Sequence, residues 1–144
     1  DFLSTRMSEE EVLKTIKTFH SESDAASPIL SLYKDESDEK EFARVLFRKS
    51  VMNDKSNLDI IQKFSQNWEI ERIALMDILL MKIALTEAQE FETIPLKVTL
   101  NEYIDISKFY STPKSNGFIN GILDKAFQDL KNSGAIKKVG RGLI

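Results

Sequence analysis

The residue types that usually carry out catalysis or metal binding are few in this 144-residue sequence. It has no cysteine and a single histidine, His20, which has no partner residues at the spacing of a metal site. It contains no phosphate-binding loop and no Gly-x-Ser-x-Gly nucleophile motif. Glu87 lies on the apolar stripe of an expected helix, and because no second catalytic group accompanies it, we expect a buried structural carboxylate. The sequence therefore predicts no catalytic residue, no metal site and no cofactor.

Residues that could contact nucleic acid lie between Lys114 and Gly121. A lysine neutralises phosphate charge and a phenyl ring stacks on bases, so Lys114, Ser115 and Phe118 are candidates for contact with nucleic acid; the alternative for Phe118 is a partly buried core position. Gly117 and Gly121 share one face of the expected helix, where each costs about 1 kcal/mol relative to alanine. Either close packing of another helix or close approach of an outside ligand to the backbone would offset that cost.

Three further polar residues occupy helices that are otherwise apolar, namely Asn101, Glu102 and Asn120. Polar side chains on packed helices usually form hydrogen bonds that fix how the helices meet. We therefore expect a structural role for these three residues.

The elements that position these residues are predicted to be helices. Five glycines and three prolines are too few turn formers for a sandwich or barrel. Apolar residues at helical spacing predict about seven helices, over residues 8–21, 27–33, 38–53, 56–68, 70–89, 94–110 and 114–132. We expect an all-α bundle with one core that includes Trp68, Met76, Leu80, Ile83, Ile119, Ile122 and Leu123.

The chain divides by composition into three parts. Residues 1–37 are an accessory helical segment of unknown role, 38–132 form the helical domain, and 133–144 are a basic tail that we expect to be flexible.

The net charge of −3 excludes a uniformly basic protein but not a local basic face. The longest apolar stretch, 73–85, is shorter than the roughly 20 residues of a membrane span, and no signal peptide is evident. We expect a cytoplasmic protein without a membrane partner.

Three segments in series resemble the NusB family of transcription antitermination factors. They are residues 68–87 (WEIERIALMDILLMKIALTE), 94–110 (IPLKVTLNEYIDISKFY) and 115–125 (SNGFINGILDK), and with the stretch from Asp38 the similarity covers about 38–132. The family's arginine-rich first helix is not found in residues 1–37, so either that helix lies upstream of Asp1 or this branch of the family binds RNA weakly.

The resemblance implies an all-helical domain without enzymatic activity. The family pairs with a ribosomal small-subunit protein that acts as NusE, and the pair binds a boxA RNA element and so acts indirectly on the RNA polymerase antitermination complex. The positions that match Glu71 and Asp77 face the ribosomal protein. The positions of Lys114 and Phe118 lie near RNA, and we expect Lys97 and Ser115 to extend that RNA-contacting edge.

The resemblance also implies that Asn101 and Asn120 belong to the helix-packing core.

Two other functions stay open. One is a NusB-like N-terminal domain of a ribosomal RNA methyltransferase, and the other is a helical adaptor that binds only protein. RNA affinity that falls with salt separates an RNA-binding protein from such an adaptor.

Overall fold

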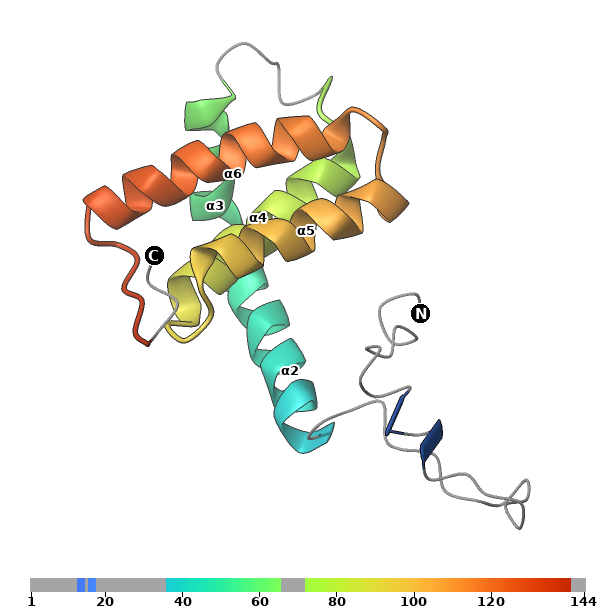
Figure 1. Cartoon of the computed structure of the whole chain (residues 1–144). Helices are drawn as coiled ribbons and strands as arrows, with labels where there is room; N and C mark the ends of the chain where they lie inside the picture. Colours follow the sequence, from blue (N-terminus) through green and yellow to red (C-terminus); the bar gives the residue numbers. More distant parts are fainter. Residues whose placement is uncertain (1–12, 15, 18–35, 66–71, 141–144) are drawn as a thin grey trace. The chain divides into compact units, whose positions relative to one another are not determined.

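The computed structural model describes residues 13–14, 16–17, 36–65 and 72–140. In this part of the chain it has five helices and no strand: α2 (Glu36–Met52), α3 (Asp54–Phe64), α4 (Leu75–Glu90), α5 (Leu96–Tyr110) and α6 (Ser115–Asn132) (Figure 1). The predicted all-α class is confirmed. Of the two additional expected helices, 8–21 is described only at 13–14 and 16–17, which are helical, and 27–33 lies outside the described residues.

The chain forms two compact units, residues 1–41 and 42–144. The described core lies in the second unit, where α4 packs against α3, α5 and α6, and α5 also packs against α6. Met81, Leu85 and Leu123 are among its fully buried side chains. A central α4 explains why its sequence is apolar on several sides and not along a single stripe.

The predicted core is largely confirmed. Its members that are buried or packed against the core are Leu80, Ile83, Ile119, Ile122 and Leu123. The prediction is wrong for Met76, which is 37% exposed; in the first turn of α4 the side chain turned inward is that of its neighbour Asp77, which is 5% exposed. Trp68 lies outside the described residues.

A buried carboxylate joins α4 to α5. Both oxygens of Glu87 accept hydrogen bonds, one from Thr99 Oγ1 at 2.7 Å and one from the Tyr103 hydroxyl at 2.8 Å. The predicted structural role of Glu87 is thereby confirmed. Burial and the nearby negative charge of Glu87 raise the pKa of Tyr103 above its usual value.

The expected packing role of Asn101, Glu102 and Asn120 is wrong, because all three side chains are exposed. On α5 the buried positions are Thr99, Tyr103 and Ser107, which repeat every four residues along one face. At about 100° per residue, positions 101 and 102 turn away from that face. Asn120 follows the buried Ile119 on α6 and turns outward for the same reason.

The segment after α6 is not a flexible tail over residues 133–140. Gly134 has a φ of 75° and ends α6, with the Ala135 N–H donating to the Leu130 carbonyl at 2.9 Å. Ile136 is only 5% exposed and belongs to the core. The Val139 N–H donates to the Glu92 carbonyl at 3.0 Å. Burial of one apolar side chain thus holds this stretch against the bundle; residues 141–144 lie outside the described residues.

Candidate nucleic-acid interface

The beginning of α6 brings together three of the four predicted RNA-contacting residues. Lys114 is the N-cap of α6 and its side chain is exposed. Phe118, one turn later, is half-buried and packs against the core. Ser115 lies between them but is 2% exposed. Lysine and phenylalanine therefore form an accessible edge, whereas the serine hydroxyl lies beneath it.

The fourth predicted RNA-contacting residue, Lys97, lies elsewhere. It is exposed in the first turn of α5, and the short turn between α5 and α6 reverses the chain direction (Figure 1). Lys97 and Lys114 are therefore separated by about the length of α5, roughly 20 Å at 1.5 Å per residue. They do not share one pocket.

A cluster of hydroxyl groups and one carboxylate holds the turn that precedes α6. Ser111 Oγ donates a hydrogen bond to Asp77 Oδ1 of α4. The Ser111 hydroxyl also lies 2.9 Å from Ser115 Oγ, and Thr112 Oγ1 lies 2.7 Å from that same atom. Asp77 is 5% exposed. The cluster fixes the position at which α6 begins, and with it Lys114.

The geometry brings Asp77 and Ser115, expected to contact two different partners, into one hydrogen-bonded network. Both are buried, so they support the surface and do not themselves form it. The exposed part of α4 beside Asp77 is apolar instead: Leu75 is 72% exposed and Leu79 41%. Glu71, the other predicted partner residue, lies outside the described residues.

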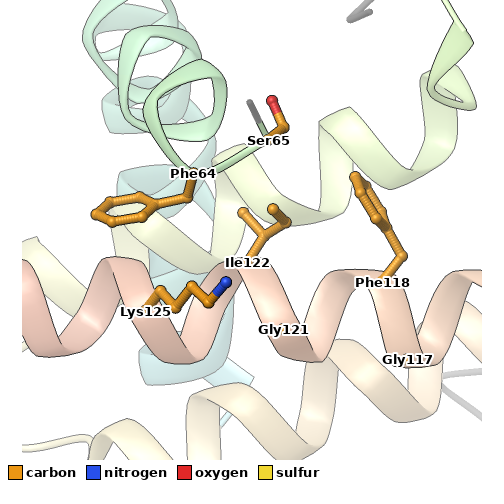
Figure 2. A pocket seen from close by; sticks show the side chains of 7 residues that line it. All are labelled: Phe64, Ser65, Gly117, Phe118, Gly121, Ile122 and Lys125. Atoms are coloured by element: carbon orange, nitrogen blue, oxygen red, sulfur yellow. The ribbon is translucent and has the colours of Figure 1, made fainter. Parts of the chain in front are cut away.

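A pocket of about 210 Å³ lies between α3 and α6. Its lining consists of Phe64, Ser65, Gly117, Phe118, Gly121, Ile122 and Lys125 (Figure 2). Among the described residues, a Cβ atom placed on Gly117 or Gly121 would meet no atom within 4 Å. Close packing of one of the described helices therefore does not account for either glycine.

Sequence reasoning missed three residues of this pocket, Phe64, Ser65 and Lys125. Lys125 was detectable, because it follows Gly121 by four residues and therefore lies on the same helix face. Phe64 was not detectable, because it belongs to α3 and only the packing of α3 on α6 brings its ring to the pocket.

Among the described helices, none combines the length and the apolar character that crossing a membrane requires. Within the same described residues, no group of histidine, aspartate or glutamate side chains is arranged to hold a metal ion.

The fold and the site define an all-α protein that presents a basic and aromatic helix edge, the class that includes helical RNA-binding regulators. The sequence model of the NusB family matches residues 5–128, a range that begins inside the segment 1–37 described above as accessory. The chain belongs to the NusB family.

Individual relatives agree with this assignment. A transcription antitermination protein NusB of Salinibacter ruber is 40% identical over 146 aligned positions, which cover 98% of this chain and 91% of that protein. The NusB protein of Chloroherpeton thalassium is 44% identical over 66% of this chain and 46% of its own length. The solved structure of T. maritima NusB aligns with a TM-score of 0.62 and 33% identity over 70% of each chain.

Proposed function

We propose that this chain is an antitermination factor of the NusB type that binds boxA-like RNA together with a ribosomal small-subunit protein acting as NusE. In this function it promotes processive transcription of ribosomal RNA operons as part of an RNA polymerase antitermination complex in the cytoplasm. It acts by binding and not by catalysis.

The observation that carries the proposal is the edge formed by Lys114 and Phe118 at the start of α6. An exposed ammonium group beside a half-buried phenyl ring offers both interactions that single-stranded RNA needs, phosphate neutralisation and base stacking.

Antitermination is favoured over a methyltransferase domain because the Salinibacter relative, 91% of which aligns with this chain, is named an antitermination protein.

The exposed apolar surface of α4 supports the proposed protein partner. Leu75, Met76 and Leu79 are all exposed and lie within about one turn of each other. Exposed apolar side chains gathered on one face are typical of protein interaction sites. We assign the contact with the ribosomal protein to this α4 face, with Asp77 supporting it from beneath.

A salt titration tests the RNA part of the proposal. Fluorescence anisotropy of a labelled boxA-like RNA would be measured at several salt concentrations, with this chain alone and with the ribosomal protein. Affinity should fall as salt rises, and Lys114→Ala should make the slope of log K against log salt less steep by about 0.7 if one phosphate contact is lost.

The matched control is Lys131→Ala, because Lys131 is exposed in the last turn of the same helix, α6. This control should leave the slope unchanged. Capture of the ribosomal protein without any binding of the RNA would overturn the RNA part of the proposal and identify a protein-only adaptor.

A further inference from the structure

Helix α2 is attached to the bundle in a different way from the other described helices. No residue of α2 is buried, whereas α3, α4, α5 and α6 each bury at least two residues. Burial of apolar surface therefore contributes less to the attachment of α2 than to that of the other four. Contacts from α2 and from Asn53, the residue that follows it, converge instead on Glu90 and Phe91 at the end of α4.

Glu90 is the polar part of this attachment. Its Oε2 atom lies 3.1 Å from Lys49 Nζ of α2. Its Oε1 atom accepts a hydrogen bond from Asn53 Nδ2 at 3.1 Å. Both partners of the ion pair are partly exposed to solvent, and ion pairs in such positions contribute little to stability. Glu90 therefore orients α2 more than it stabilises it.

Phe91, the residue directly after α4, is held from two sides. Its ring packs on the ring of Phe42 in α2, with the ring centroids 4.8 Å apart and the planes inclined by 58°, which is typical of favourable aromatic pairs. Its carbonyl accepts a hydrogen bond at 2.7 Å from Lys138 Nζ. The ring of Phe91 thus contacts α2, and the backbone of the same residue contacts the segment that follows α6.

Residues 136–139, here called the strap, run from the end of α6 to the turn between α4 and α5 (Figure 1). Ile136 is buried in the core at one end of the strap. At the other end the Val139 N–H donates to the carbonyl of Glu92, the residue after Phe91. The strap therefore bonds two successive carbonyl groups of the turn.

The ammonium group of Lys138 is partly withdrawn from water. Partial burial lowers the pKa of Lys138 from its usual value, although the negative charges of Glu87 and Glu92 act in the opposite direction. A partly desolvated ammonium group needs a hydrogen-bond acceptor, and the Phe91 carbonyl provides one. The contact between the strap and Phe91 is therefore favoured by the position of Lys138 as well as by its charge.

We propose that the strap controls whether α2 stays attached to the end of α4. While Lys138 holds the Phe91 carbonyl, the Phe91 ring stays packed on Phe42; when the strap leaves the turn, Phe91 moves and α2 detaches. Few contacts oppose this step, because α2 buries no side chain. Such a local opening requires less free energy than global unfolding. The inference does not depend on the proposed function.

Hydrogen exchange of the full chain, followed by mass spectrometry, measures detachment of α2. The variant is Lys138→Met, which keeps an unbranched side chain and removes the ammonium donor. Exchange in residues 42–52 should become at least about fivefold faster, the lower end of the usual coupling between distant sites. Exchange in α6 should change by less than about twofold, because the opening is local.

Two further variants isolate the hydrogen bond of Lys138. The matched control is Lys137→Met, at the exposed position next to it, which should leave exchange in residues 42–52 unchanged. Lys138→Arg retains a charged N–H donor and should keep that exchange slow.

The coupling between the strap and α2 must also be reciprocal. Phe42→Leu removes the aromatic contact with Phe91 and leaves the strap unaltered. It should accelerate exchange in residues 42–52 and, through Phe91, exchange of the Val139 amide that donates to Glu92. A contact that only stabilised the strap would not respond to a change in α2.

Three results would overturn the inference. In the first, Lys138→Met leaves exchange in residues 42–52 unchanged, so that the strap does not affect α2. In the second, Lys138→Met accelerates exchange in α2 and α6 equally, which is a general loss of stability. In the third, Phe42→Leu does not change exchange at Val139. Faster exchange confined to α2 and the strap, together with slow exchange in Lys138→Arg, would support it.

Discussion

Replacement of the buried carboxylate of Asp77 by alanine tests whether one network supports both proposed binding surfaces. Asp77 lies in the first turn of α4 and accepts a hydrogen bond from Ser111, whose hydroxyl is linked to Ser115 in the first turn of α6. Asp77→Ala removes the acceptor and leaves the partly buried Ser111 hydroxyl without it. The expected result is a less stable junction of α4, α5 and α6.

The size of the effect follows from two contributions. A hydrogen bond to a charged group stabilises a fold by about 1.5–3 kcal/mol. A carboxylate in the first turn of a helix adds about 0.3–1 kcal/mol through the helix dipole. Together they predict a loss of about 3 kcal/mol in the free energy of unfolding for Asp77→Ala, which for a chain of this length corresponds to a fall of roughly 10 °C in Tm.

Chemical denaturation followed by far-UV circular dichroism measures this loss. The matched control is Asp105→Ala, because Asp105 is about half exposed and pairs with Lys108 three residues away; it should cost no more than about 0.5 kcal/mol. A double-mutant cycle of Asp77→Ala with Ser111→Ala should give a coupling of about 1.5 kcal/mol. The reasoning is refuted if Asp77→Ala costs no more than the control or if the cycle shows no coupling.

Three further predictions concern other parts of the fold. Because burial and the charge of Glu87 raise the pKa of Tyr103 above 10.0, the folded state keeps this proton where the unfolded state loses it. Stability should therefore fall as pH rises above about 10, and urea titrations should show a smaller fall for Tyr103→Phe. Ile136→Ala should lower the free energy of unfolding by at least about 2 kcal/mol, and no change would mean that residues 133–140 are not anchored. Leu75→Glu should abolish pull-down of the ribosomal protein without changing Tm, whereas Val98→Glu, at an exposed apolar position of α5, should not affect it; equal pull-down by both variants would exclude the α4 face.

The sequence alone was sufficient for the fold class, most of the helices and the position of the candidate edge. These features depend on local rules: apolar spacing reveals the buried face of α6, and Gly134 marks its end. The same rules placed Lys114 and Phe118 one turn apart on one helix. Local spacing was less reliable at α4, where a helix apolar on several sides gives no sign of which apolar residues, such as Leu75, stay exposed.

Tertiary packing decided what each polar or small residue does. Asn101 and Asn120 were expected to pack because they are polar residues on largely apolar helices. The core fixes the rotation of each helix about its axis, and that rotation turns both side chains outward. Asp77 is an ordinary surface carboxylate by sequence, yet the antiparallel packing of α4 and α5 brings it to Ser111, 34 residues away. The role of Gly121 depends on whether another helix covers it, and none does among the described residues. A sequence specifies neighbours along a helix, whereas contact, burial and open space between helices exist only once the helices pack.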